Sequence, residues 1–160
     1  MEVSLFEPRI PQNTGNIARS CAAFNIPLNL IEPMGFKIED KYLKRAGLDY
    51  WPLVTVNKYE NFDKLLASKE RKRIISFSKK NGTYLRDFKF KQEDILLFGR
   101  EDSGLPECII DKSDFLISIF MPNLQTGENE QKGVRSLNLS VACGIAIYEA
   151  HKQINFQNAY

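Results

Sequence analysis

Short apolar segments typical of buried strands alternate along this chain with segments of helical pattern, and this alternation restricts the possible folds severely. It favours an α/β fold with a largely parallel sheet flanked by helices. Strands are expected at residues 3–6, 28–31, 53–56, 73–77, 95–98 and 115–119. Helices are expected at residues 13–24, 40–47 and 59–68, from Pro106, and at residues 141–151.

The last helix follows a small, polar stretch, residues 135–140. Its apolar residues recur at helical spacing and define one face: Val141, Ile145 and Tyr148. Asn138 or Ser140 is the expected N-cap, since either side chain can accept an unpaired N–H group of the first turn. A helix start also carries a partial positive charge, which suits a polar ligand. An ordinary amphipathic helix has the same pattern, so this stretch alone leaves both interpretations open.

The composition is that of an ordinary globular protein. Of its 160 residues, 43% are hydrophobic and 26% are charged, and a chain of this length predicts one domain, residues 1–160. No run is long and apolar enough to cross a bilayer, and the first residues resemble a strand rather than a signal peptide. We therefore expect no membrane partner. The three cysteines have no metal-like spacing, which favours a reduced, cytoplasmic setting.

Several common chemistries find no support in the sequence. His151 is the single histidine, and nothing places it beside a nucleophile or in a metal cluster, so no metal is expected. Neither the GxxxxGK[ST] phosphate loop nor a GxGxxG turn after the first strand is present. The usual nucleotide-binding signatures are therefore absent from an α/β chain.

Three loops rich in glycine or polar residues remain as candidates. They span residues 7–19, 98–106 and 135–140. In open α/β sheets, ligands bind where the carboxyl ends of strands meet such loops. Gly99 and Gly104 alone could simply make turns, and Asn13 alone could simply cap a helix. The three loops together, in this order, form a more specific pattern.

The motifs in these loops are Asn13-x-Gly15-x-x-x-Arg19, Gly99-x-Glu101-x-x-Gly104-Leu105 and Ser136-Leu137-Asn138-Leu139-Ser140. With them the chain resembles the SPOUT class of RNA methyltransferases over residues 2–153. Residues 31–36 and 45–50 resemble, within that class, the subfamily that methylates the ribose 2′-hydroxyl of the wobble pyrimidine, position 34, of leucine tRNAs. The resemblance implies a deep C-terminal trefoil knot beginning near Leu96, a fold that connection rules alone would not suggest.

The resemblance also implies S-adenosyl-L-methionine as cofactor. The residues expected around it are Phe77, Gly99, Leu105, Ile119, Ser136 and Leu137. The apolar residues among them would form the walls around the adenine, and Gly99 would let the backbone approach the ligand closely. Without the resemblance, Phe77 and Ile119 would be interpreted as strand core.

Four residues are expected to take part in catalysis: Arg19, which stands at the catalytic position of the class, and Asn13, Glu101 and Asn138 from the motifs. Because a guanidinium stays protonated, Arg19 is expected to grip an RNA phosphate and stabilise a developing alkoxide rather than act as a base. Glu101 is expected to orient a loop amide or Arg19, with a solvated carboxylate as the alternative. The two asparagines are expected to fix loops and substrate, and Asn138 could also be a simple cap.

A tRNA partner is expected from the resemblance, although the net charge is only +2. The basic residues expected to contact its phosphates are Arg9, Lys41, Lys44, Arg45 and Arg100. A basic run at residues 69–73, followed by Lys79 and Lys80, is more typical of a solvated surface. A homodimer through the knot helices is expected, because the small and apolar residues of the last helix suit close helix packing.

Two features depart from the pattern. Arg100 stands earlier in its motif than in close relatives, and residues 123–133 form a long loop, typical of a lid or a disordered segment. Other interpretations therefore stay open: a SPOUT 2′-O-methyltransferase acting elsewhere on tRNA or on rRNA, or a non-catalytic RNA-binding dimer.

Overall fold

The computed structural model describes residues 1–37, 50–68, 72–122 and 133–156. Within these ranges a parallel sheet has the strand order β3-β2-β1-β6-β4-β7-β5. The strands are β1 Glu2–Phe6, β2 Leu28–Ile31, β3 Val56–Tyr59, β4 Ile74–Phe77, β5 Thr83–Tyr84, β6 Ile95–Phe98 and β7 Phe115–Ser118. The parallel α/β prediction is confirmed. Because all strands point the same way, their carboxyl ends share one edge of the sheet.

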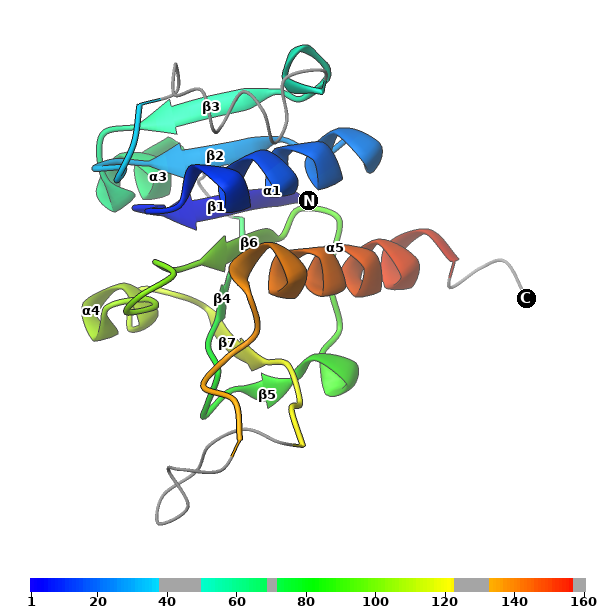
Figure 1. Cartoon of the computed structure of the whole chain (residues 1–160). Coiled ribbons are helices and arrows are strands. Elements are labelled where there is room, and N and C mark those ends of the chain that lie inside the picture. The colour runs from blue at the N-terminus through cyan, green and yellow to red at the C-terminus, as the bar shows by residue number, and fades with distance from the viewer. Residues whose placement is uncertain (38–49, 69–71, 123–132, 157–160) are drawn as a thin grey trace.

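Helices cover both faces of the sheet (Figure 1). The α-helices are α1 Pro11–Ala23, α3 Phe62–Ser68, α4 Glu107–Ile110 and α5 Leu139–Phe156, and the 3₁₀ helices are η1 Trp51–Leu53 and η2 Leu85–Asp87. One core cluster joins α1 and α5 to the sheet, and a second joins α3 and α4 to its other face. A sheet buried on both faces explains why the strands are continuously apolar rather than alternating.

Helix α5 buries a different side from the one that its sequence pattern emphasises. Cys143, Ala146, Ile147 and Ala150 are fully buried against the sheet and α1. Val141, Ile145 and Tyr148 remain 50%, 40% and 61% exposed. The helix therefore has two apolar sides, and one of them faces outward.

Several expected boundaries were wrong around the third strand. Residues 51–53 form η1 and the strand runs Val56–Tyr59, because Pro52 has no N–H for a ladder and favours a helical turn. Tyr59 thus belongs to the strand, and the next helix begins at Phe62. The Asn61 side chain accepts the N–H of Lys64 at 2.9 Å there, as an N-cap does.

Other boundaries differ less. Helix α1 begins at Pro11, a residue suited to a first turn, with Ile10 at the N-cap. Asn13 therefore lies inside the helix, and its expected capping role was wrong. Strand β5, two exposed residues long, was not predicted, because so short a segment shows no periodicity. Residues 38–49 and 123–132, which contain an expected helix and most of the long loop, lie outside the described residues.

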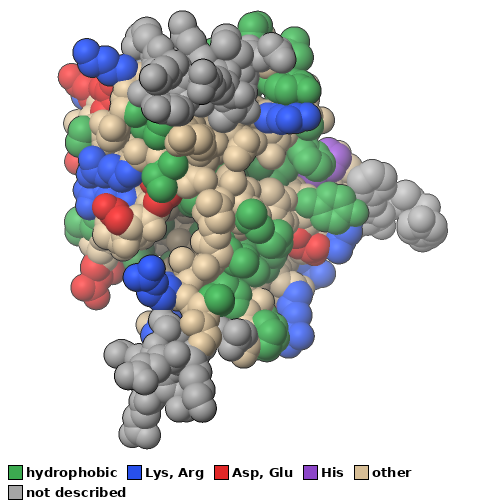
Figure 2. Space-filling model, in the orientation of Figure 1, with side chains coloured by type: hydrophobic (Ala, Val, Ile, Leu, Met, Phe, Trp, Pro, Cys, Tyr) green, Lys and Arg blue, Asp and Glu red, His purple; other side chains and the backbone are tan. Residues whose placement is uncertain are grey.

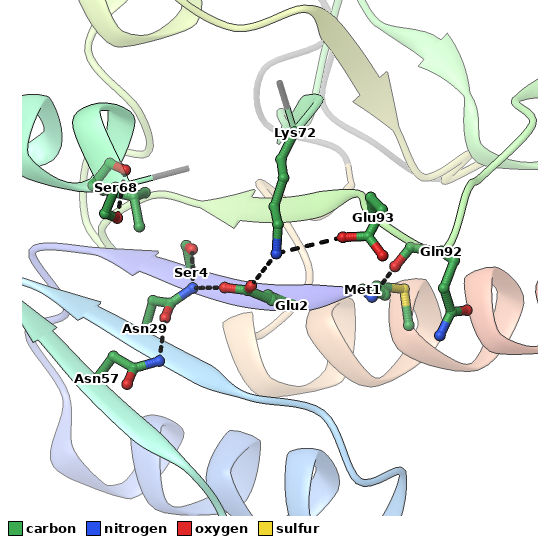
Figure 3. A network of polar contacts seen from close by, with 10 residues as sticks. Met1, Glu2, Ser4, Asn29, Asn57, Ser68, Lys72, Gln92 and Glu93 are labelled. Carbon is green, nitrogen blue, oxygen red and sulfur yellow. Dashed lines mark hydrogen bonds and ion pairs between the residues drawn. The ribbon is translucent and has the colours of Figure 1, made fainter. Parts of the chain in front are cut away.

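A buried polar network joins three neighbouring strands on the side of α3 (Figure 3). Asn29 donates to Glu2 at 2.8 Å and to Ser4 at 3.1 Å, and it accepts from Asn57 at 2.9 Å. Lys72 donates to Glu2 at 2.8 Å, and this hydrogen bond raises the pKa of the lysine. Glu2 is thus paired despite its burial, which offsets the cost of removing a carboxylate from water.

Two of the three cysteines pack as small buried hydrophobes. Cys21 and Cys143 are buried, and burial raises the pKa of the Cys21 thiol to about 12. Both thiols therefore stay protonated and inert near neutral pH. Cys108, on the short helix α4, is exposed instead.

Candidate functional site

A cavity of about 240 Å³ lies at the carboxyl ends of β4, β6 and β7. Its wall includes residues directly after each of these strands and the segment that leads into α5. All six residues expected at the cofactor line it: Phe77, Gly99, Leu105, Ile119, Ser136 and Leu137. The structure thus brings together residues that lie up to 60 positions apart in the chain. They meet at the carboxyl ends of the strands, which is where open α/β sheets bind ligands.

Three of the four expected catalytic residues form one hydrogen-bonded chain. The Asn13 amide donates to Glu101 Oε1 at 3.2 Å, and the Asn138 amide donates to Asn13 Oδ1 at 3.0 Å. Glu101 also accepts the backbone N–H groups of Arg9 at 2.8 Å and Ile10 at 3.1 Å. One carboxylate therefore ties the first loop to the second, and two asparagines extend the connection to the third.

Asn138 also caps α5, so its two expected roles coexist. Its Oδ1 accepts the Ser140 N–H at 2.9 Å and the Ser140 hydroxyl at 2.7 Å. Ser140, the other candidate cap, lies inside the first turn. The amide group thus orients the helix start toward the first loop and satisfies an unpaired helix donor.

Gly99 is required for a steric reason that the sequence did not indicate. A Cβ at Gly99 would lie 2.2 Å from the backbone carbon of Gly104 and 2.3 Å from the nitrogen of Leu105. The space is occupied by the chain itself, because residues 100 and 104 pair across a tight turn. Gly104 completes this turn with a φ of 73°, a left-handed conformation that favours glycine.

The cavity combines apolar walls with charged residues. Phe77 stacks on Phe98 with ring centroids 4.5 Å apart and planes at 12°, so it is both strand core and cavity wall. Arg100, Glu101 and Asp102 also belong to the lining. The Ser103 hydroxyl donates to Asp102 and lowers the pKa of that carboxyl. Flat apolar surfaces next to hydrogen-bonding groups fit an adenine with its ribose and a charged amino-acid tail.

Glu7 is a site-adjacent residue that the sequence analysis missed. Its Oε2 accepts Arg100 Nη2 at 2.5 Å and Nε at 2.9 Å, and Arg9 Nη2 at 3.2 Å. Arg9 and Arg100, two of the three arginines expected at the RNA, are therefore paired with this carboxylate and only part-exposed. The position of Glu7 directly after the first strand was the available signal. Lys41, Lys44 and Arg45 lie outside the described residues.

Arg19 is the expected catalytic residue that lies outside this hydrogen-bonded chain, and it does not line the cavity. It is exposed on α1, and its guanidinium lies over the Tyr50 ring, 4.6 Å from the centroid. The hydrogen bonds of Glu101 among the described residues go to the first loop and Asn13, not to Arg19. Of the two expected functions of Glu101, the structure thus favours orienting loop amides over orienting Arg19.

Two absences apply to the described part of the chain. No cluster of three or more His, Cys, Asp or Glu side chains is arranged to hold a metal there. No helix in that part has the length and apolar character needed to span a membrane.

The chain belongs to the SpoU rRNA Methylase family, whose model matches residues 1–148. The tRNA (cytidine(34)-2′-O)-methyltransferase of Methylovorus glucosotrophus is 37% identical, over 99% of this chain and 98% of that protein. The protein of the same description from Escherichia coli is 35% identical, over 99% and 97%. A solved structure described as giving insights into the 2-OH methylation of C/U34 on tRNA is 42% identical, with a TM-score of 0.87 over 95% of this chain and 94% of that one.

Proposed function

We propose that this protein transfers a methyl group from S-adenosyl-L-methionine to the ribose 2′-hydroxyl of the wobble pyrimidine, position 34, of tRNA, and that leucine tRNAs are its substrates. The observation that carries the proposal is the hydrogen-bonded chain from Glu101 through Asn13 to Asn138, which joins the three motif loops beside the cavity. The relatives of known description, similar over nearly their full length, support the same reaction.

S-adenosyl-L-methionine, when bound, supplies an electrophilic methyl group on a positively charged sulfur. Phe77, Leu105, Ile119 and Leu137 would hold the adenine between apolar walls, and Ser136 would offer a hydroxyl to its polar groups. Dry walls favour a reaction in which charge is neutralised, because water stabilises the charged reactant. Glu101 keeps the turn after β6 in place by binding the amides of the first loop.

Arg19 is proposed to hold the phosphate beside the target ribose and to stabilise negative charge that develops on the 2′-oxygen. Its exposed position on α1 leaves the guanidinium accessible to a phosphate. Arg9 and Arg100, with the basic residues 41, 44 and 45, are proposed to position the RNA backbone. Such contacts set orientation rather than sequence preference.

A homodimer is proposed through the outward side of α5. Figure 2 shows hydrophobic side chains gathered over the region of this helix. Three large apolar side chains exposed on one helix side are unfavourable in water and would be covered by a second copy. The domain extent, residues 1–160, and a cytoplasmic location also stay predictions.

The decisive experiment is mass spectrometry of nucleosides from tRNA incubated with the purified protein and S-adenosyl-L-methionine. We expect a 2′-O-methyl pyrimidine, mapped to position 34 by digestion of purified leucine tRNA. Methylation at another position would favour a different enzyme of the family. RNA binding without methylation of any tRNA or rRNA would favour a non-catalytic dimer and overturn the proposal.

A further inference from the structure

Two aromatic side chains are exposed together at the carboxyl edge of the sheet. Tyr84, on β5, pairs in register with Ser118 of β7, and Phe120 follows two residues later. Their rings meet edge to face, with centroids 5.6 Å apart and planes at 86°. Tyr84 is 44% exposed and Phe120 is 60% exposed, so the pair offers aromatic surface that the described fold does not use.

The pair lies on the outer side of the cavity wall. Ile119 and Met121 both line the cavity, and Phe120 stands between them in the chain. In an extended segment successive side chains point to opposite sides, which explains why Phe120 is exposed while its neighbours are half-buried. Phe120 is therefore an exposed ring directly between two residues of the cavity wall.

The backbone beneath the pair is held firmly. The Gly82 N–H donates to Ser118 Oγ at 3.0 Å, and a Cβ at Gly82 would lie 2.6 Å from the Ile117 carbonyl carbon. Strand β5 thus packs directly on β7. A surface that is already ordered loses little conformational freedom when a ligand binds.

One cation lies against the pair, and others occur at the same edge of the sheet. The Arg86 guanidinium lies 6.0 Å from the Tyr84 centroid, and the exposed Lys79 and Lys80 follow the carboxyl end of β4, the other neighbour of β7. Asp87, 3.5 Å from Arg86, balances one of these charges. In Figure 2 Lys and Arg side chains border hydrophobic ones in the lower half of the molecule. Aromatic surface with an excess of positive charge suits a single-stranded nucleic acid better than a second apolar protein face.

We propose that Tyr84 and Phe120 form a stacking platform for an unpaired base of the RNA substrate, next to the nucleotide that enters the cavity. This rests on the proposed function. The platform contributes binding rather than chemistry, because it lies outside the cavity that receives the methyl donor. Stacking is tolerant of base identity, so the platform adds affinity without specifying sequence.

The test compares steady-state methylation of tRNA by the wild type and by Phe120→Ala, Tyr84→Ala and the double variant. Each single variant is expected to raise the KM for tRNA about tenfold with less than about a twofold change in kcat. Binding of S-adenosyl-L-methionine, measured by calorimetry, should stay unchanged. Tyr84→Phe and Phe120→Tyr keep a flat ring and should remain close to wild type.

Phe115→Ala is the matched control, since Phe115 begins β7, at the end of this strand opposite Phe120, and is 42% exposed. It should leave the KM for tRNA unchanged. An unchanged KM in the double variant would overturn the platform, as would a double variant that becomes monomeric in light scattering while the wild type is dimeric. Wild-type protein without activity would instead count against the proposed function.

Should an alanine variant fail to fold, Phe120→Trp gives a second measurement. The indole at position 120 should lose fluorescence when a tRNA anticodon stem-loop is added, beyond the change shown by the native Trp51 in the wild type. No additional quenching at saturating RNA would contradict stacking at this position.

Discussion

At the scale of single residues, Asn13 shows how a side chain acquires its function from distant partners. Its amide was a plausible helix cap from the sequence, yet it sits inside α1 and bridges Glu101 to Asn138. Both partners come from other loops. The amide is suited to this because it donates and accepts at once.

We expect Asn13→Ala to lower the free energy of unfolding by about 1–3 kcal/mol, because it removes one hydrogen bond from Glu101 and takes from the Asn138 amide its acceptor on Asn13. It should also weaken binding of S-adenosyl-L-methionine severalfold, since the loops lose their connection. Chemical denaturation and calorimetry measure the two effects. Asn16→Ala, an exposed asparagine on the same helix, is the control and should change neither.

Arg19→Ala is expected to abolish turnover while binding of S-adenosyl-L-methionine is largely kept, because Arg19 does not line the cavity. Arg19→Lys should recover little, since an ammonium cannot bind a phosphate through two parallel hydrogen bonds. Single-turnover methylation and calorimetry separate the two properties. Equal loss of both would mean that Arg19 acts at the cofactor.

At the scale of elements, the turn from Gly99 to Gly104 gives the cavity part of its wall. The residue after β6 has no room for a side chain, because the chain folds back on itself at once. The turn is then held from outside by Glu101 and the first loop. Its geometry depends on two glycines and one carboxylate.

We expect Gly99→Ala to destabilise the protein by several kcal/mol and to abolish donor binding, because its Cβ would collide with backbone that cannot move aside. Gly144→Ala is the control: its Cβ would meet no atom within 4 Å in α5. Alanine there should stabilise the helix by up to about 1 kcal/mol. Thermal unfolding of both variants provides the measurement, and a Gly99→Ala protein as stable as wild type would refute the steric argument.

At the scale of the whole molecule, the outward side of α5 leads to a prediction about assembly. Ile145→Glu and Tyr148→Glu should convert a dimer to a monomer, because each places a charge in an apolar contact. Light scattering coupled to size-exclusion chromatography measures this. Leu53→Glu, which alters an exposed apolar residue on η1 rather than on α5, should leave the mass unchanged. A monomeric wild type at micromolar concentration would rule out the proposed dimer.

The sequence pattern was sufficient for the parallel α/β architecture, and the family resemblance was needed to predict six of the residues that line the cavity. Strand and helix patterns are local, and a loop that contains glycine or asparagine can be recognised within a few residues of sequence. The strand boundary near Pro52 was predicted wrongly because the proline interrupts the local pattern. Strand β5 was not predicted because two residues are too few to show one.

Sequence alone determined which residue types stand at the ends of which strands, because those patterns arise between near neighbours in the chain. Only the tertiary structure decided that Glu101 holds loop amides, that Asn13 bridges rather than caps, and which side of α5 is buried. The bonds from Asn13 to Glu101 and from Asn138 to Asn13 join residues 88 and 125 positions apart. Contacts at such separations have no local periodicity, and they form only when the sheet brings its carboxyl ends to one edge.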